Sequence, residues 1–240
     1  MSIDAALEAR DLDVLYEDYQ ILWNVSFVAP RGQVIAILGP NGSGKSTLMN
    51  TLSGLVRPRT GEISLGAQRI DGLPPHRIVS LGLAHVLERR RLFPYLSVRQ
   101  NLFLGAYHPA AKARREETLA EVEALFPRLR ERRSQAAGTL SGGEQQMVAI
   151  ARGLMARPSI LMVDEPFLGL APRVIEQIAH VLTAINRERG ITVIFIEQNV
   201  EMALTMAHRA IVLESGRTIL EGPSADLLAS AEVKRVFLGH

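Results

Sequence analysis

The segment that most constrains the fold of this 240-residue chain joins a short apolar run to a glycine-rich loop. Residues 34–38 are all apolar, which is typical of a strand buried on both faces. They continue directly into the sequence GPNGSGKST at residues 39–47, after which a helical pattern begins. A strand, this spacing of glycines and a helix are the context of a phosphate-binding loop. We therefore predict an α/β core built around this strand.

The chemistry of this loop explains how it would hold phosphate groups. Gly42 and Gly44 let the backbone curl so that successive N–H groups face phosphate oxygens, and the helix start adds partial positive charge. Lys45 can reach the β- and γ-phosphates, and the Ser46 hydroxyl can bind Mg²⁺. The predicted nucleotide-binding residues are Gly39, Pro40, Asn41, Gly42, Ser43, Gly44, Lys45, Ser46 and Thr47. By itself this motif also allows a kinase, a GTPase or another nucleotide switch, or a turn that only joins strand to helix.

Two carboxylates follow a second apolar run at residues 160–163. Asp164 and Glu165 would emerge at the carboxyl end of a core strand, where open α/β sheets place their ligands. Asp164 is placed to hold Mg²⁺, and Glu165 is the candidate general base that deprotonates the attacking water. An acidic turn without function is the alternative for the pair alone.

Further apolar runs extend the predicted fold. Residues 192–196 and 210–213 complete a largely parallel sheet, and residues 7–15, 21–29 and 62–65 indicate a small antiparallel layer. We expect a helical lobe at about residues 87–156, inserted into a core formed by residues 1–86 and 157–240, all within one domain spanning residues 1–240.

A helix over residues 112–133 is expected within that lobe. Leu119, Val122, Phe126 and Leu129 fall on one face of it, with Pro127 as a kink or end.

Composition excludes several classes of function. The net charge of +2, from 27 basic and 25 acidic residues, provides no broad field for nucleic acid, so we expect no nucleic-acid partner. The chain has no cysteine, which excludes a disulfide framework or a thiolate metal site. No apolar run approaches the roughly 18 residues of a membrane span. The first residues lack the pattern of a secretory signal, so we expect none.

A third motif opens a helix at residues 140–146, with the sequence LSGGEQQ. Ser141 and Glu144 have the spacing of a capping box, which explains part of it. Capping does not explain the consecutive glycines Gly142 and Gly143, which weaken a helix and leave backbone N–H groups open to an anion.

With these motifs in this order, the chain resembles the ATP-binding cassette (ABC) ATPases over its whole length. The resemblance implies a P-loop NTPase fold that binds ATP and Mg²⁺, with ATP held between two subunits. In such a sandwich Ser141 and Gly143 would contact the γ-phosphate held by the other subunit, within a signature segment that we define as residues 140–146 and that includes Gly142 and Glu144. Tyr16 would stack on adenine, with Tyr19 as the second candidate and an ordinary strand aromatic as the alternative.

Two positions depart from most members of this family. Glu88 stands where most have a glutamine that contacts Mg²⁺ and the attacking water, and Gln198 stands in place of a histidine. An amide still donates a hydrogen bond to the γ-phosphate but cannot carry a proton charge. We expect an active enzyme in which Glu165, Lys45, Gln198 and Glu88 act in catalysis and Ser46, Asp164 and Glu88 hold the metal.

With Glu88, Gln198 and the sequence around them, the chain resembles the ATPase subunits of the high-affinity branched-chain amino-acid importers. One local difference is that Leu87 and Arg89 replace the usual proline and glycine on either side of the glutamate. The resemblance implies a second, identical or related ATPase subunit, two transmembrane permease subunits and a periplasmic or extracellular solute-binding protein. It places the chain peripherally on the cytoplasmic face of the cell (inner) membrane. Leu170 and Ala171 would touch the second ATPase subunit.

A groove around residues 88–107 would seat a helix of a membrane subunit. The candidate contacts are Phe93, Tyr95, Leu96 and Leu102, each of which is equally well explained by core packing, and Arg89, Arg90 and Arg91 could form a solvated basic turn. Related systems that import urea and amides or export lipopolysaccharide remain alternatives, as do non-transport ABC ATPases and, more remotely, a small-molecule phosphotransferase.

Overall fold

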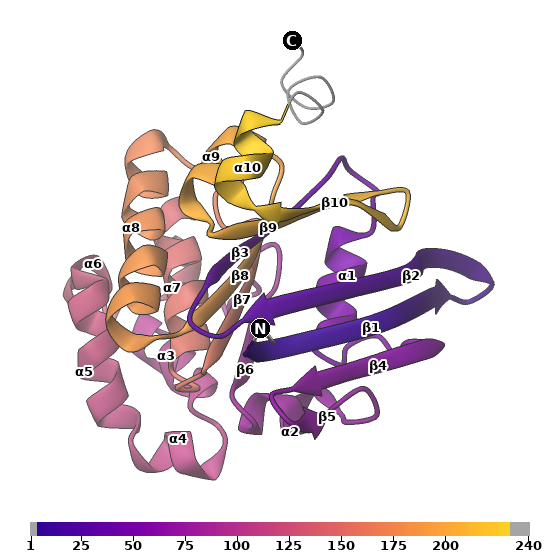
Figure 1. Cartoon of the computed structure of the whole chain (residues 1–240). Coiled ribbons are helices and arrows are strands. Elements are labelled where there is room, and N and C mark those ends of the chain that lie inside the picture. The colour runs from indigo at the N-terminus through magenta and orange to yellow at the C-terminus, as the bar shows by residue number, and fades with distance from the viewer. Residues whose placement is uncertain (1–3, 231–240) are drawn as a thin grey trace.

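The computed structural model describes residues 4–230, which form two β-sheets covered by helices (Figure 1). Residues 1–3 and 231–240 lie outside the described part. The expectations of one domain over residues 1–240 and of no secretory signal at the start therefore extend beyond it. Among the helices within residues 4–230, none has both the length and the apolar character to cross a bilayer.

The larger sheet has six strands in the order β10-β9-β3-β8-β7-β6. Its strands are β3 (Val34–Leu38), β6 (Leu83–Val86), β7 (Ile160–Asp164), β8 (Thr192–Glu197), β9 (Arg209–Glu214) and β10 (Arg217–Pro223). Neighbouring strands are parallel except for β10, which pairs antiparallel with β9 at one edge. The four strands predicted for this sheet are confirmed. The sequence gives no comparable signal for β6, which is short, or for β10, which is mostly exposed.

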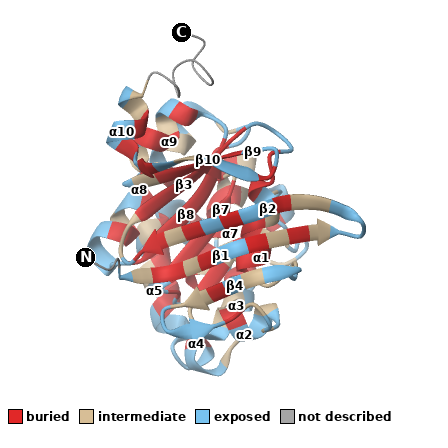
Figure 2. Ribbon diagram, turned by 45° about the vertical axis from the view of Figure 1, so that its right-hand side comes forward, coloured by how far each residue is buried: buried red, intermediate tan, exposed pale blue. Residues whose placement is uncertain are grey.

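The central strands β3, β7 and β8 of this sheet are buried along their whole length, as Figure 2 shows in red. In β3, Ile35 and Ile37 pack into one hydrophobic core and Val34, Ala36 and Leu38 into another. Because side chains alternate along a strand, an unbroken apolar run requires a cover on each face of the sheet. The antiparallel layer with α1 (Lys45–Leu52) covers one face, and longer helices cover the other.

The antiparallel layer has four strands in the order β2-β1-β4-β5. They are β1 (Ala5–Tyr16), β2 (Tyr19–Pro30), β4 (Thr60–Leu65) and β5 (Gln68–Arg69). The tight turn between β1 and β2 and the pairing of β4 with β1 confirm the predicted layer. Leu48, Met49 and Leu52 of α1 are buried between this layer and the larger sheet, so α1 starts at the phosphate loop and ends in a core.

Most of the remaining helices follow β6 and precede β7 in the sequence, or cover the face of the larger sheet that is opposite the antiparallel layer. They are α2 (Pro75–Ser80), α3 (Val98–Gly105), α4 (Pro109–Ala113), α5 (Arg115–Leu125), α6 (Pro127–Glu131), the 3₁₀ helix η1 (Ala137–Thr139), α7 (Gly142–Leu154), α8 (Pro172–Arg189), α9 (Val200–Met206) and α10 (Ser224–Ala229). The division of the chain into a core and a helical lobe at about residues 87 and 156 stays a prediction.

The expectation of one helix over residues 112–133 is wrong, because the chain forms α4, α5 and α6 instead. Arg114 and Phe126 leave the helical conformation, with φ of −112° and −127°. Pro127 begins α6, where its missing N–H donor is harmless, and so ends α5 as predicted. The predicted apolar face is nevertheless buried at Leu119, Val122, Phe126 and Leu129.

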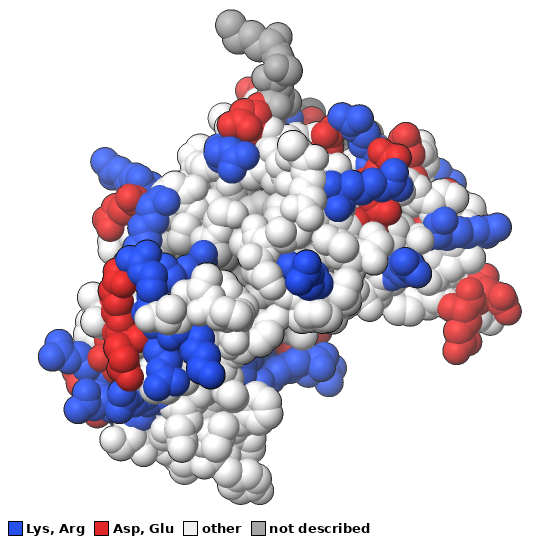
Figure 3. All heavy atoms as spheres, turned by 90° about the horizontal axis from the view of Figure 1, so that it is seen from below, with Lys and Arg blue, Asp and Glu red and all other residues white. Residues whose placement is uncertain are grey.

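Charged side chains do not form a face of one sign on the side of the molecule shown in Figure 3. Basic and acidic groups alternate in clusters there, and broad uncharged areas lie between them. Surface ion pairs in the described part of the chain include Arg99 with Glu116 and Arg128 with Glu131.

Candidate functional site

The phosphate loop, residues 39–47, turns tightly between β3 and α1 at positions where only glycine fits. Gly39 has φ of 146°, and a Cβ there would lie 2.1 Å from the carbonyl oxygen of Leu213. Gly44 has φ of 102°, and a Cβ there would lie 2.6 Å from a methyl carbon of Leu22. Both clashes involve neighbouring strands or loops of the same chain. The curl of the loop is therefore fixed by packing around it as well as by its own sequence.

Lys45 is buried inside the loop and is only 5% exposed. Its Nζ donates hydrogen bonds of 2.9 Å to the carbonyl oxygens of Gly39 and Pro40. Burial lowers the pKa of this ammonium, and the nearby carboxylates of Glu165 and Asp164 oppose that shift. A cation held by two carbonyls at the centre of the loop can exchange them for phosphate oxygens without leaving its place.

Asp164 is the last residue of β7 and is 4% exposed. Burial raises the pKa of its carboxyl to about 6, although a hydrogen bond with Ser46 acts in the opposite direction. Its Oδ1 is buried and has no hydrogen-bond partner among residues 4–230. An orphaned carboxylate oxygen beside a serine hydroxyl fits a hard cation that prefers oxygen ligands.

Within residues 4–230, no group of three or more His, Cys, Asp or Glu side chains is arranged to hold a metal by itself. Mg²⁺ commonly takes one or two protein ligands and completes its shell with phosphate oxygens and water. The oxygens of Ser46 and Asp164 therefore fit an ion that arrives with a nucleotide.

Glu165 and Gln198 meet above the phosphate loop, although they are 33 positions apart. The amide Nε2 of Gln198 donates a 2.7 Å hydrogen bond to Oε1 of Glu165. Glu165 has a left-handed backbone with φ of 46°, which is uncommon for a residue with a Cβ and is typical of functional sites. The carboxylate is thus held over the loop by both its backbone and its partner.

These residues surround a pocket of about 620 Å³. It is lined by Ile21, Asn41, Gly42, Gly44, Lys45, Ser46, Thr47, Glu88, Glu165, Leu168 and Gln198. Glu88 therefore lies where the sequence predicts it, and its carboxylate forms a 3.5 Å ion pair with Arg89. Tyr16 and Tyr19 are exposed and do not line this pocket, and Ile21 lines it instead. Contact of Tyr16 with adenine stays a prediction.

Glu197, at the end of β8, belongs to this neighbourhood but was not predicted from the sequence. Its buried carboxylate accepts hydrogen bonds from the backbone N–H groups of Gln198 (3.0 Å) and Asn199 (3.3 Å). Burial raises its pKa. The sequence signal for Glu197 is an acidic residue at the end of an apolar strand. Asp164 has the same position at the end of β7.

The signature segment begins α7 with the predicted capping box. The backbone N–H of Ser141 donates to the Glu144 carboxylate (2.9 Å), and the backbone N–H of Glu144 donates to Ser141 Oγ (3.3 Å). Ser141 itself is exposed. None of the residues of this segment lines the phosphate pocket, so the two motifs form separate surfaces of this chain.

The two glycines of the signature segment each face a different neighbour. A Cβ at Gly142 would lie 3.1 Å from Nη2 of Arg90, and a Cβ at Gly143 would lie 2.7 Å from Cγ1 of Val174. Close packing against α8 therefore explains glycine at position 143, whereas a Cβ at position 142 would require only a small shift of the Arg90 guanidinium. The expectation that Arg89, Arg90 and Arg91 form a solvated turn is wrong for Arg90, which is half-buried.

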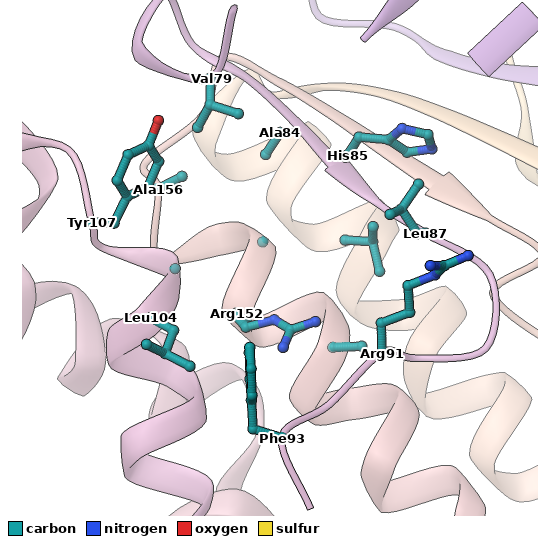
Figure 4. Close-up of a pocket in the computed structure, with 14 residues that line it drawn as sticks. Val79, Ala84, His85, Leu87, Arg91, Phe93, Leu104, Tyr107, Arg152 and Ala156 are labelled. Atoms are coloured by element: carbon teal, nitrogen blue, oxygen red, sulfur yellow. The ribbon is translucent and has the colours of Figure 1, made fainter. Parts of the chain in front are cut away.

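A second hollow, of about 320 Å³, lies between β6, α3 and α7 (Figure 4). Leu87, Phe93 and Leu104 surround it with the guanidinium groups of Arg91 and Arg152. We call this hollow the groove. Its apolar lining and its two cations distinguish it from the phosphate pocket.

The four predicted groove contacts differ in their exposure. Phe93 is 54% exposed and Tyr95 is 95% exposed, whereas Leu96 is half-buried. Leu102 is 1% exposed, so the expectation that it seats a membrane-subunit helix is wrong. It faces the core because it lies on the inner side of α3.

A phosphate loop and two carboxylates at the carboxyl edge of a parallel sheet define a P-loop nucleotide-binding protein. A family profile described as "ABC transporter" matches residues 22–168. The chain belongs to the ABC transporter family and is one of its ATP-hydrolysing cassettes.

The relatives of the chain carry transport names. It is 43% identical to the high-affinity branched-chain amino acid transport ATP-binding protein BraG of Pseudomonas aeruginosa, over 93% of this chain and 95% of that protein. It is 35% identical to the probable branched-chain amino acid transport protein LivF of Archaeoglobus fulgidus, over 97% and 98%. The lipopolysaccharide export protein LptB of Escherichia coli is 31% identical, over 98% of each chain.

Solved structures agree with this fold. The ADP form of the cassette MJ1267 superposes with a TM-score of 0.86 at 25% identity, covering 98% of this chain and 99% of that one. A dimer of the cassette MJ0796, bound to ADP and phosphate after hydrolysis, gives a TM-score of 0.77 at 27% identity, over 91% and 98%.

Proposed function

We propose that this chain energises the import of branched-chain or other hydrophobic amino acids by hydrolysing ATP for separate membrane subunits. The observation that carries this proposal is the 43% identity with BraG over almost the whole chain. Glu88 and Gln198 both line the phosphate pocket. Each differs from the residue that most of the family has at its position, and this combination supports the same subfamily. The lower identity with LptB makes lipopolysaccharide export the second candidate.

Within one chain, the phosphate loop would hold the β- and γ-phosphates through its N–H groups and Lys45. Ser46 and Asp164, with Glu88 close by, would hold Mg²⁺, which neutralises charge that develops on the phosphate oxygens. Glu165 would take the proton of the attacking water, and Gln198 would orient the Glu165 carboxylate through the 2.7 Å hydrogen bond. Glu165 would thus be fixed in direction before the nucleotide binds.

A second cassette would complete the site with its own signature segment, including Ser141 and Gly143. The separation of that segment from the phosphate pocket in one chain supports this arrangement, as does the dimer of MJ0796. Leu170, which is half-buried, and Ala171, which is exposed, precede α8 on the loop that would touch the second cassette.

The groove would receive a helix of a transmembrane permease subunit, with the chain attached peripherally to the cytoplasmic face of the cell (inner) membrane. Phe93 and Leu104 are large apolar side chains that remain exposed beside it, which supports a docking surface. Phe93→Asp should release the cassette from the membrane subunits and leave ATP binding by the isolated cassette intact. Unchanged copurification of this variant would count against the groove.

The proposal is tested by purifying the chain with its membrane subunits and reconstituting them in vesicles. Binding proteins loaded with leucine, urea or no ligand are then compared for their stimulation of ATP hydrolysis. Stimulation by the leucine-loaded protein alone supports amino-acid import. Stimulation by urea, or ATP hydrolysis that no binding protein changes, contradicts it.

A further inference from the structure

Residues 88–91 connect three separate places in this chain. Glu88 lines the phosphate pocket, and Arg91 lines the groove. Arg90, between them, turns toward α7, where its Nη1 donates a 3.3 Å hydrogen bond to Oε1 of Gln145. This short segment therefore touches the nucleotide site, the signature helix and the groove in succession.

Arg90 contacts both ends of α7. Its guanidinium covers the first turn, with Nη2, Nη1 and Cζ at 3.1, 3.3 and 3.4 Å from where a Cβ of Gly142 would stand. Its carbonyl oxygen accepts a 3.1 Å hydrogen bond from Nη2 of Arg152, in the last turn. A side chain that grips one end of a helix while its backbone is held by the other end fixes the helix relative to the segment.

The backbone of the segment is in an uncommon conformation. Arg89, Arg90 and Arg91 have φ of 62°, 60° and 43°, all in the left-handed region that residues with a Cβ rarely adopt. Such conformations persist where the surrounding structure holds them. The contacts of Arg90 with α7 tie the segment to the helix, and the backbone N–H of Arg91 donates a hydrogen bond to the carbonyl oxygen of Arg89 within it.

We infer that Arg90 is a positioning residue that sets the first turn of α7 for the nucleotide on the second cassette. The inference rests on the proposed pairing of two cassettes. Backbone N–H groups at the start of a helix bind phosphate only when they point at it, so a small rotation of this turn changes the contact. A lysine cannot replace Arg90, because the contact with Gly142 uses a planar guanidinium.

The test measures closure of the cassette pair separately from nucleotide binding. In the Glu165→Gln background, which is expected to trap ATP-bound dimers, dimer formation is followed by light scattering as ATP is titrated. Adding Arg90→Ala or Arg90→Lys should raise the ATP concentration needed for dimers about tenfold or more. Binding of a fluorescent ATP analogue to the monomer should not change. Arg133→Ala, an exposed arginine of the same helical region, is the matched control and should behave as the parent.

The outcomes separate this inference from the proposed function. If the parent Glu165→Gln forms no dimer with ATP, the paired-cassette proposal fails. If the parent forms dimers and the Arg90 variants form them at the same ATP concentration, the role of Arg90 is overturned. Thermal melting of each variant distinguishes a defect in closure from a loss of folding, and the Lys variant keeps the test informative if the Ala variant is unstable.

A double-mutant cycle with Gly142→Ala tests the contact itself. The added methyl group would lie 3.1–3.4 Å from the guanidinium, closer than ordinary contact, so Gly142→Ala should displace Arg90 and raise the ATP requirement for dimers in its presence. In the Arg90→Ala background the same change should have a much smaller effect. Independent, additive effects of the two substitutions would show that Arg90 does not act through Gly142.

Discussion

The phosphate loop and the signature segment are both glycine-rich turns that start a helix, yet they are built differently. In the phosphate loop the functional cation, Lys45, is 5% exposed and held by carbonyl oxygens of its own loop. In the signature segment Ser141 is exposed, and the glycines are packed against residues from other parts of the chain. One is a nearly finished binding site, and the other is a surface.

This difference shows which residues determine the conformation of each motif. The residues of the phosphate loop that would bind phosphate follow one another in the sequence, although packing against Leu22 and Leu213 also fixes the curl of the loop. In the signature segment Ser141 is exposed, and Arg90, 55 positions from Gln145, contacts the first turn of the helix. One chain carries the phosphate loop and the signature segment on separate surfaces. It can therefore contribute one half of a nucleotide site with each of them.

The largest effect is expected at Glu165, the candidate general base beside the phosphate loop. Glu165→Gln keeps the size of the side chain and removes its basicity, so ATP hydrolysis should fall about 10²- to 10⁴-fold. ATP binding should remain, because the phosphate loop is unchanged. The check is steady-state phosphate release alongside equilibrium binding of ATP, and undiminished turnover would remove Glu165 from its role.

A matched pair of substitutions tests the comparison directly. Lys45→Ala should weaken ATP binding to the monomer about 10- to 100-fold, since it removes a charged hydrogen-bond donor to phosphate. Ser141→Ala should leave monomer binding unchanged and lower only the turnover of the paired cassettes. Isothermal titration of both monomeric variants is the measurement. Equal losses of affinity in the monomers would mean that the phosphate loop and the signature segment of one chain bind the same nucleotide.

Burial of a histidine at the edge of the groove (Figure 4) also predicts a dependence of stability on pH. Nδ1 of His85, in β6, lies 3.0 Å from the hydroxyl of Ser53, just after α1, and its buried Nε2 has no hydrogen-bond partner within residues 4–230. Burial lowers the pKa of His85 from 6.5 to about 4. Between these values the unfolded chain takes up a proton and the folded chain does not, so stability is lost as the pH falls below 6.5.

The expected contribution of His85 is a loss of about 1.4 kcal/mol at pH 5.5 relative to pH 7.5. It is obtained as the difference between the parent and His85→Gln, because Asp164 titrates in the opposite sense in the same range. Urea unfolding at both pH values measures it. His85→Gln should remove this part of the pH dependence, whereas His76→Gln, at an exposed histidine of α2, should keep it. A parallel pH dependence in all three proteins would show that His85 does not contribute.

The smallest effect is expected between the two regions, at Arg89. A left-handed conformation costs a residue with a Cβ about 1–2 kcal/mol, and glycine gives back about 0.5–1 kcal/mol through its freer unfolded chain. Arg89→Gly should therefore stabilise the protein by about 0.5–1 kcal/mol in denaturant titrations. A loss of stability would mean that the φ of 62° at this position is not a strain.

The sequence predicts the phosphate loop well because the residues that would bind phosphate are close together in the chain. An apolar strand, the glycine spacing and Lys45 follow one another in the chain, and the structure places them as expected. The capping box at Ser141 is equally local, since its partners are three positions apart. The same holds for Asp164 at the end of β7.

Contacts between distant residues are what the sequence does not predict. Nothing near Gly142 and Gly143 indicates that Arg90 and Val174 fill the space beside them. The Gln198 amide reaches Glu165 only because β7 and β8 are adjacent in the sheet. The end of a helix at Arg114 also escapes the helical periodicity, because no proline or glycine marks it.

Gln198 gives the site a property that the more usual histidine would not. An amide has no pKa in the physiological range, whereas an imidazole changes charge near pH 6.5. The hydrogen bond of Gln198 to Glu165 therefore keeps the same donor when the interior of a cell becomes mildly acidic or alkaline. An uptake system powered by such a cassette would have one fewer titrating group above its phosphates, and its supply of nutrients would depend less on the acid–base state of the cell.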